Sequence, residues 1–420
     1  MSEKLVRTHH NLLSHQPLIS AYTLRYKRIV MATKSGDEHV YDVCVIGAGV
    51  NGSAAAYSLS TSHTSNVLLL EQFPVPHTRG SSHGQSRIIR CSYSDLIYSQ
   101  MTFDAFDAWK DLEEKYGERL LIQNGMLDIF VDDSETIKKY VSNLSCVGAP
   151  CAVLDAAEVN RRFPLFRIPM TCRAIYEPGG GTLLASKCVS ALHRLFVSNG
   201  GTFVDSESVM KIDPGEVVTI HTSKSRYMAK SVIIAAGAYT SKLSTQLGLR
   251  LPLEVQRTHP LYWRLDDPVA ASVDSNFPSF ISRLTGEVYG LATYEYPEHI
   301  KICRHAGPVI DPEHPDVVAP LLGEVKEFIE KYTNGIESSD PSIVETCMYT
   351  VTPDGNFIID THPIYKNIVL AAGFSGHGFK MSMTTGKILA DLALGRTPGY
   401  DLSMFQIGRF GDAVREQSKL

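Results

Sequence analysis

Three glycines near the N-terminal end of the chain are spaced to bind a dinucleotide. Gly47, Gly49 and Gly52 follow the apolar run Tyr41–Ile46 in G-x-G-x-x-G spacing. In such a turn the first glycine makes the bend, the second lets the backbone approach a pyrophosphate, and the third lets a helix pack on the strand. The N-terminus of that helix offers unpaired N–H groups and a positive dipole end to the phosphates. Dinucleotide binding is therefore the first chemistry that the sequence indicates.

An acidic residue supports this interpretation. Glu71 closes a second apolar run, Val67–Leu70, about 20 residues after Gly52, where an acid accepts hydrogen bonds from the adenosine ribose hydroxyls. The alternative is a plain strand–turn–helix whose glycines only make a turn, and the acid and the helix-compatible residues 53–60 argue against it. An acid at this position argues against NADP, but the fingerprint alone does not separate FAD from NAD.

Two further turns of small residues also follow apolar runs. The runs 231–235 and 367–371 resemble 41–46, and buried runs of this kind are typical of parallel strands. Glycine-rich turns let the backbone approach a ligand closely, so we expect the three strands to meet at one cofactor. Contact from several strands suits a larger cofactor than NAD and disfavours a classical NAD dehydrogenase. The candidate cofactor-binding glycines of these turns are Gly237, Gly373, Gly376 and Gly378.

The segment 74–93 is basic and rich in Gly, Ser and His. It shows no hydrophobic periodicity, and loops of this length are usually functional. It could wrap a cofactor and place charges near its ring, and Ser81 and Ser82 are its candidate cofactor-binding residues. Two isoleucines separate Arg87 from Arg90, so in an extended chain the two arginines point to opposite faces and need not share a role.

Three clusters, together with the glycine fingerprint, resemble the monomeric sarcosine oxidase family. They are Gly80–Arg90 (GSSHGQSRIIR), Cys347–Asp354 (CMYTVTPD) and Gly373–Lys380 (GFSGHGFK), in the family's order from Tyr41 onward. The resemblance implies an α/β fold of two domains, a Rossmann-like FAD-binding domain and a β-sheet-rich substrate domain, as in glutathione reductase and D-amino-acid oxidase. It also implies oxidation of a secondary amino acid (sarcosine, L-pipecolate, L-proline or similar) to an imine, with O2 reduced to H2O2.

The resemblance also assigns roles to single residues. It implies that FAD is attached covalently to Cys347, since a thiolate can add to the electrophilic 8α position of oxidised flavin; the alternative is a buried inert cysteine. Arg90 and Lys380 match the pair that binds the substrate carboxylate. A guanidinium can bind a carboxylate bidentately and a lysine adds a second positive charge, although either residue could instead form a structural salt bridge.

Five further residues match positions around the flavin and the substrate. His83 and Arg87 match residues beside the flavin ring, where a cation favours reduced flavin. Lys301 matches the lysine that reaches the flavin N5 through a water and promotes reaction with O2, once a one-residue insertion is placed between Tyr289 and Lys301. Tyr289 and His305 match the remaining pocket positions, which contact the substrate carboxylate and tune amine protonation. No strong base is required, because positioning supplies much of the acceleration.

Two other functions stay open. A flavin amine dehydrogenase would pass electrons to a carrier instead of O2, and Lys301 argues against it. A catalytically silent flavoprotein would have lost Cys347, Arg90, Lys301 or Lys380, and none of these is lost. The substrate stays open too, since all the candidates fit a carboxylate site with a small apolar pocket. Arg304 occupies a position where the family usually has a less polar residue.

The apolar pattern divides the chain between two domains. We expect the FAD-binding domain over 41–120, 175–252 and 341–417, and the substrate domain over 121–174 and 253–340. We expect helices over 100–116, 132–147, 156–163 and 185–199, within 312–334, and from the last glycine-rich turn to 394. We expect strands over 125–130, 172–176, 253–264 and 287–291, with 301–305 joining the last two, and a small β element from 202–204, 217–221 and 226–228.

Composition and the chain ends narrow the class of protein. A net charge of −5 suggests no nucleic-acid or membrane partner, and no apolar run approaches the about 18 residues of a membrane helix. The scattered cysteines predict neither a metal site nor a disulfide framework, and the family leans to monomers. Residues 1–40 are interpreted as a disordered extension with Met31 as a possible shorter start, or as a transit segment. The ending Ser418-Lys419-Leu420 is a peroxisomal import address, so we expect a peroxisomal protein that binds the import receptor.

Overall fold

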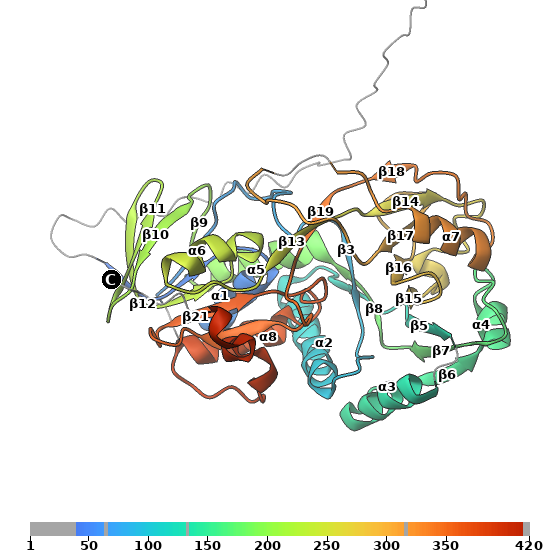
Figure 1. Cartoon of the computed structure of the whole chain (residues 1–420), viewed down its shortest axis with the longest axis horizontal. Coiled ribbons are helices and arrows are strands. Elements are labelled where there is room, and N and C mark those ends of the chain that lie inside the picture. The colour runs from blue at the N-terminus through green and yellow to red at the C-terminus, as the bar shows by residue number, and fades with distance from the viewer. Residues whose placement is uncertain (1–38, 63–65, 132–133, 315–317, 415–420) are drawn as a thin grey trace, which may run out of the picture. The chain divides into compact units, whose positions relative to one another are not determined.

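Two eight-stranded sheets carry the fold (Figure 1). The computed structural model describes residues 39–62, 66–131, 134–314 and 318–414, so the N-terminal extension and the tail Ser418-Lys419-Leu420 lie outside the described residues. The first sheet takes strands from residues 40–70, 202–234 and 358–372, and the second from 126–177, 261–304 and 343–344. The described residues nevertheless belong to a single compact unit, so the predicted division into two domains stays a prediction.

The first sheet holds the strands that end in the glycine-rich turns. Its order is β10-β11-β12-β1-β2-β9, with β21 pairing β12 and β20. β1 pairs in parallel with β2 and β12, and β12 pairs in parallel with β21, so the three strands predicted to meet are neighbours. The bounds are β1 Val40–Ile46, β2 Val67–Leu70, β9 Thr202–Val204, β10 Val209–Asp213, β11 Val218–Thr222, β12 Arg226–Ile234, β20 Ile358–Thr361 and β21 Ile368–Ala372.

Side chains alternate between the two faces along each strand, and both faces of this sheet are buried. Val43 and Val45 of β1 belong to a core that includes residues of four helices, whereas Cys44 and Ile46 pack on the other face with Leu243 of α6. Near-continuous apolar strands are what a sheet covered on both faces requires. The helices are α1 Val50–Thr61, α2 Leu96–Tyr116, α5 Ala185–Ser198, α6 Thr240–Gln246 and α8 Ser382–Ala393.

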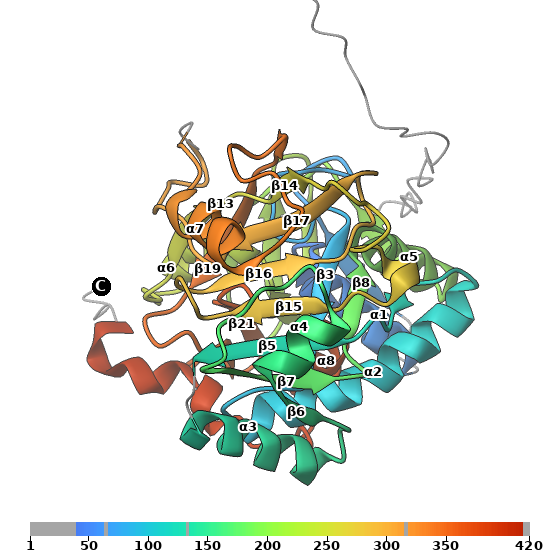
Figure 2. The ribbon, with the colours of Figure 1, turned by 90° about the vertical axis from the view of Figure 1, so that its right-hand side faces the viewer.

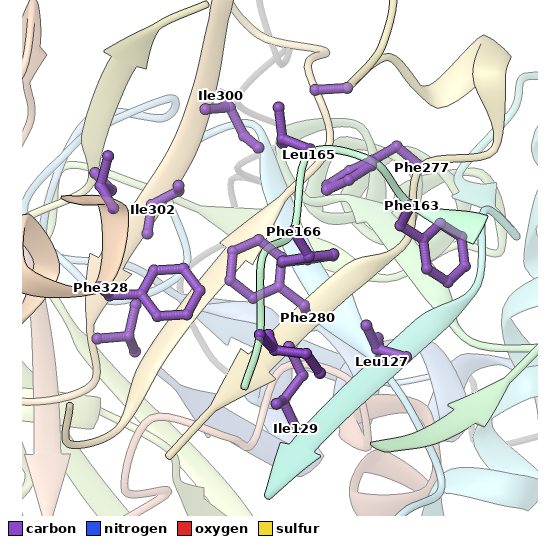
Figure 3. Packing of buried hydrophobic residues seen from close by; sticks show 14 of the residues in the cluster. Leu127, Ile129, Phe163, Leu165, Phe166, Phe277, Phe280, Ile300, Ile302 and Phe328 are labelled. Carbon is purple, nitrogen blue, oxygen red and sulfur yellow. The ribbon is translucent and has the colours of Figure 1, made fainter. Parts of the chain in front are cut away.

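The second sheet has the order β18-β14-β17-β16-β15-β5-β7-β6, and several of its strands run side by side in Figure 2. An aromatic core lies against it, and Figure 3 shows Phe166, Phe280 and Phe328 together within that core. The bounds are β5 Met126–Val131, β6 Ala152–Asp155, β7 Cys172–Glu177, β14 Leu261–Arg264, β15 Ser279–Ser282, β16 Val288–Leu291, β17 His299–Arg304 and β18 Ile343–Val344, with helices α3 Ser134–Val147, α4 Ala156–Arg162 and α7 Gly323–Tyr332.

Three predicted elements were wrong. The strand predicted over 253–264 is two strands, β13 Glu254–Thr258 and β14, which lie in different sheets because Pro260 has no N–H to donate to a ladder. The predicted small β element is part of the first sheet, where β9 pairs with β2 and β11 pairs with β12. The segment 74–93, predicted to be a loop, contains a strand, β3 Ser86–Ile89.

Strand β3 belongs to a small third sheet of order β3-β8-β4, with β8 Gly181–Leu184 and β4 Leu121–Ile122. β13 pairs with β19 Cys347–Val351, the strand that begins at the candidate flavin-attachment cysteine. The other predicted helices and strands are present, although the strands predicted over 226–228 and 231–235 are one strand, β12, and α2 begins at Leu96, one turn before its predicted start. Among the described residues, none of the helices has both the length and the apolar character to cross a membrane.

Candidate active site

A cavity of about 380 Å³ lies where β1, β2, β12 and β21 end. The glycine-rich turns that follow β1, β12 and β21 all line it, as the sequence predicted. The predicted cofactor-binding residues on its wall are Gly47, Gly49, Glu71, Ser81, Ser82, Gly237, Gly373, Gly376 and Gly378, and His83 lies there too. Gly52 does not line it; a Cβ at Gly52 would lie 1.9 Å from the Gly47 carbonyl oxygen, so this glycine serves the packing of helix on strand.

Glu71 lies at the end of β2 with both carboxylate oxygens engaged. Oε2 accepts from the Ala48 N–H at 2.9 Å and Oε1 from the Phe73 N–H at 3.1 Å. Burial acts to raise the pKa of Glu71, but His77 and these two backbone donors hold it below its ordinary value. The carboxylate is therefore charged, fixed against the glycine turn, and able to accept further hydrogen bonds through its remaining lone pairs.

The N-terminus of α1 keeps polar capacity for a ligand. The Val50 N–H donates to Ser82 Oγ at 2.9 Å, so this donor of the first turn is already used. Asn51 Oδ1, in the same turn, is buried without a hydrogen-bond partner among the described residues, and Asn51 lines the cavity. An unpartnered buried acceptor is costly unless a ligand donates to it. Together with the glycines and Glu71, this arrangement fits an extended dinucleotide.

A second cavity, of about 260 Å³, shares Tyr349 and Phe379 with the first. It brings together residues that are far apart in the sequence, from β3, β16, β17, β19 and the last glycine-rich turn. The predicted site residues that line it are Arg87, Arg90, Tyr289, Lys301, His305, Cys347 and Lys380. Arg87 and Arg90 thus line the same cavity, because β3 ends at Ile89 and its alternation does not continue to Arg90.

Arg90 is 6% exposed and is held by a buried acid. Its Nη1 lies 3.7 Å from Asp128 Oδ2 and 3.3 Å from Ser92 Oγ, and the guanidinium lies over the Tyr93 ring at 4.2 Å. Burial acts to lower the pKa of Arg90, but Asp128 holds it above its ordinary value. Its Nε has no partner among the described residues, so a charged guanidinium retains a buried donor.

Lys380 is 7% exposed and lacks a carboxylate partner. Its Nζ donates to the His377 carbonyl oxygen at 3.2 Å and lies 5.8 Å from the centre of the Tyr93 ring. No acidic side chain among the described residues lies within ion-pair distance of it. Burial, and then the charge of Arg90, hold the pKa of Lys380 well below its ordinary value. An anion in the cavity would relieve both effects.

Arg87 connects the 80–87 segment to Cys347. Its Nη2 donates to the carbonyl oxygens of Ser81 at 3.0 Å and His83 at 2.6 Å, and lies 3.7 Å from Cys347 Sγ. The His83 ring nitrogens lie 2.7 Å and 2.8 Å from the carbonyl oxygens of Gly80 and Thr346, and a neutral imidazole can donate to only one of them. Burial and the charge of Arg87 lower the pKa of His83, which leaves Arg87 as the cation of this pair.

His305 and two tyrosines form the side of the cavity next to the last glycine-rich turn. Tyr349 Oη lies 3.3 Å from His305 Nδ1, and the rings of Tyr289 and His305 are 6.1 Å apart. Burial lowers the pKa of His305 and raises that of Tyr289, so both side chains are uncharged at neutral pH. Gly376 makes this packing possible, because a Cβ there would lie 2.5 Å from His305 Cε1 and 2.6 Å from Tyr349 Cε2.

Lys301 lies on β17 and is paired inside the protein. Its Nζ is 3.2 Å from Glu295 Oε1 and 3.2 Å from Ser86 Oγ, and Ser86 Oγ also donates to Glu295. The Lys301 and Glu295 side chains are 3% and 2% exposed. This ammonium is therefore buried at the wall of the second cavity and is not a lysine at a solvated sheet edge.

Sequence reasoning missed three residues of this site. Tyr349 follows Cys347 by two positions in the same motif, so its place in the motif was a signal. Asp128 is a charged residue inside the apolar strand MLDIFV, and a buried charge of this kind usually has a partner. Glu295 lies in a loop without periodicity and carried no signal. Arg304 pairs with Glu324 of α7 and does not line the second cavity, so it does not alter the pocket directly.

The FAD dependent oxidoreductase (DAO) family model matches residues 42–392. The chain is 39% identical over 383 residues to human (Homo sapiens) peroxisomal sarcosine oxidase, covering 90% of this chain and 98% of the relative. It is 32% identical over 400 residues to the monomeric sarcosine oxidase of Bacillus sp. (strain NS-129), covering 90% and 98%. The chain belongs to the sarcosine oxidase family of FAD dependent oxidoreductases. The predicted family is thereby confirmed.

Solved structures agree on the fold of this family member. The amino acid oxidase NikD has a TM-score of 0.75 and 24% identity, covering 88% of this chain and 98% of NikD. The L-proline dehydrogenase from P. horikoshii has a TM-score of 0.75 and 22% identity, covering 90% and 100%. The predicted fold class is confirmed, and the cofactor is FAD, for which the first cavity supplies the glycine turns, Asn51 and Glu71. FAD supplies the two-electron acceptor for the substrate.

Proposed function

We propose that this protein oxidises a secondary amino acid, such as sarcosine, L-pipecolate or L-proline, to an imine and reduces O2 to H2O2. One observation carries the proposal. Arg90 and Lys380 are buried cations with unused donors, and they line a cavity that shares Tyr349 and Phe379 with the FAD cavity. A substrate carboxylate would satisfy both cations, and the sarcosine oxidases among the relatives act on an amino acid by name.

The side chains of the cavity account for binding and orientation. Arg90 and Lys380 bind the carboxylate, and the Tyr289 hydroxyl can donate a further hydrogen bond to it. His305 is neutral, so it does not repel a protonated amine as it enters and can accept a proton from it. The substrate nitrogen must be unprotonated before its electrons can leave. Fixed positions for the carboxylate and the amine orient the reacting C–H bond toward the shared wall, which is how positioning accelerates the reaction.

We propose that Cys347 holds FAD covalently. Its sulfur lies beside the Arg87 guanidinium, and the next two residues, Met348 and Tyr349, line the FAD cavity. Thiolate is the form of cysteine that adds to an electrophilic carbon. Cys347→Ser should release the flavin on acid precipitation, leaving a colourless pellet and a yellow supernatant. Cys303→Ser, at a buried cysteine on β17, is the control and should keep a yellow pellet; a yellow pellet from the Cys347 variant would refute the assignment.

We propose that Lys301 promotes the reaction with O2. The first electron transfer to O2 creates negative charge, and an ammonium at the cavity wall stabilises it. Lys301→Met should slow reoxidation by O2 by about 100-fold or more and change the rate of flavin reduction by the substrate far less. Equal slowing of the two half-reactions would remove Lys301 from the oxygen reaction.

The experiment that tests the whole proposal is anaerobic mixing with sarcosine, L-pipecolate and L-proline in turn, followed by admission of air. Loss of flavin absorbance and its rapid return with H2O2 supports the oxidase, and the relative rates identify the preferred substrate. Bleaching without return in air would make the protein a dehydrogenase that uses a carrier. Absence of bleaching with all three amines would overturn the assigned substrate class.

We propose that the protein works in the peroxisome as a monomer. The human and mouse relatives are named peroxisomal, relatives from bacteria are named monomeric, and the chain ends in Ser418-Lys419-Leu420. An import receptor would read this tail as an address. A fluorescent fusion at the N-terminus should co-localise with a peroxisomal marker and become diffuse when the last three residues are removed; unchanged localisation would contradict the proposal.

A further inference from the structure

A buried carboxylate lies directly behind Lys301. Glu295 belongs to the connection between β16 and β17, and its Oε1 accepts from both Lys301 Nζ and Ser86 Oγ. Ser86, on β3, also accepts from Lys301 Nζ at 3.2 Å, so the three side chains form a closed set of contacts. Lys301 and Ser86 line the second cavity, whereas Glu295 does not.

The arrangement fixes both the charge and the direction of Lys301. Burial of an isolated ammonium is so unfavourable that the group gives up its proton or turns toward solvent, whereas a buried, hydrogen-bonded ion pair keeps its charge. Glu295 and Ser86 contact the ammonium at the end of the lysine side chain, at the wall of the second cavity. Removing only the carboxylate charge therefore leaves the ammonium without an acidic partner at ion-pair distance among the described residues.

We propose that Glu295 is a positioning residue for the reaction with O2, which keeps Lys301 charged and directed at the reaction cavity. The inference rests on the proposed role of Lys301 as the cation of the oxygen side. Glu295 does not touch the second cavity, so it acts through Lys301 and not on the substrate. Loss of its charge should therefore affect the oxygen reaction and leave the carboxylate site at Arg90 and Lys380 unchanged.

Other titratable groups lie near Glu295, Lys301 and Ser86. Tyr262 of β14 lies under Lys301, with Nζ 5.5 Å from the ring centre, and its hydroxyl donates to Glu345 at 3.1 Å. Tyr296 also donates to Glu345, at 2.6 Å. Across the cavity lie Arg87, Tyr289 and Cys347, and Cys303 lies two residues along β17. Burial raises the pKa of Tyr262, Tyr289 and Cys303, so none of these three replaces the Glu295 charge at neutral pH.

The test compares wild-type holoenzyme with Glu295→Gln, Lys301→Met and the control Glu345→Gln. Glutamine keeps the shape of the glutamate side chain and one acceptor oxygen. The control makes the same change at Glu345, which contacts Tyr262 and not Lys301. Flavin content and melting temperature verify that each variant folds and holds FAD. Two quantities are then measured at pH 6 and pH 8, each against wild type at the same pH: the second-order rate constant for reoxidation by O2, and the flavin midpoint potential by dye equilibration without substrate.

We expect Glu295→Gln at pH 8 to reoxidise at least tenfold more slowly than wild type, and its potential to fall by about 30 mV, the equivalent of a tenfold change for a two-electron couple. At pH 6 the rate constant should return to within threefold of wild type and the midpoint potential to within about 14 mV of it, the equivalent of threefold for a two-electron couple. Lys301→Met should stay slow at both pH values, because methionine cannot regain a charge. Glu345→Gln should resemble wild type throughout.

Three results would overturn the inference. Glu295→Gln could match wild type at pH 8, it could stay slow at pH 6, or Glu345→Gln could lose as much as Glu295→Gln. The failure of the proposed function is a separate outcome, because it would show as a wild-type flavin that substrate bleaches and air does not restore. In that case the midpoint potentials still decide whether Glu295 acts through Lys301.

Discussion

Replacing Lys380 by methionine tests the carboxylate site most directly. Methionine keeps an unbranched apolar side chain and removes the ammonium, whose hydrogen-bond acceptor among the described residues is the His377 carbonyl oxygen. The free site holds the pKa of Lys380 well below its ordinary value. A bound carboxylate favours the charged form, so binding above that lowered pKa must take up a proton, whereas binding below it does not.

The size of the effect follows from the contacts. A hydrogen bond to a charged group contributes about 1.5–3 kcal/mol, which corresponds to about 10- to 150-fold in affinity. We expect Lys380→Met to weaken the binding of a simple carboxylate by this factor at neutral pH. In the wild type, affinity should also fall about tenfold per pH unit once the pH exceeds the pKa of Lys380 in the free site. The variant should lose that slope, because no proton is taken up.

The assay is titration of the oxidised holoenzyme with acetate, followed by the flavin difference spectrum between pH 6 and pH 10. Lys387→Met removes an exposed lysine from α8 and should leave both the affinity and its slope unchanged. The reasoning is refuted if Lys380→Met binds acetate within threefold of wild type at neutral pH, or if it keeps the alkaline slope.

Three other substitutions test neighbouring contacts. Asp128→Asn should lower the free energy of unfolding by about 3–5 kcal/mol, because it leaves the buried Arg90 without its carboxylate; a loss below about 1 kcal/mol in urea denaturation would contradict this. Gly376→Ala should lower the melting temperature more than Gly395→Ala, since both sites have positive φ but only Gly376 is crowded; equal losses would show that the crowding is relieved. Tyr349→Phe should lower kcat/KM about two- to tenfold through the lost contact with His305, and an unchanged value would remove that contact from the mechanism.

The sequence predicted the FAD half of the site more fully than the substrate half. Gly47, Gly237 and Gly373 each follow a short apolar strand, and parallel strands of this kind must lie side by side, so their turns were expected to meet. Local pattern was enough there. In the second cavity, the matches to a family placed Arg90 and Lys301, but no local pattern predicted Asp128 beside Arg90 or Glu295 beside Lys301.

The reason is that ion-pair partners in a sheet protein are set by register and not by sequence distance. Asp128 reaches Arg90 because β5 lies beside β7 and β15, and Ser86 of β3 reaches both Lys301 and Glu295 from another sheet. Such contacts depend on how three sheets pack, which periodicity within one segment does not contain. The break at Pro260 shows the converse, since one residue without an N–H was a local signal that should have divided the predicted strand.

Strand β17 also sets the spacing between two residues of the site. Lys301 lies within β17 and His305 is the first residue beyond its end, and side chains at even spacing in an extended chain leave on the same side, about 13 Å apart for four residues. The distance between the Cα atoms of the residue assigned to oxygen and the residue assigned to the amine is therefore set by the backbone. A single residue inserted between them would turn His305 to the side of the strand opposite Lys301. The spacing of these two groups along the cavity is thus built into the count of residues in one strand.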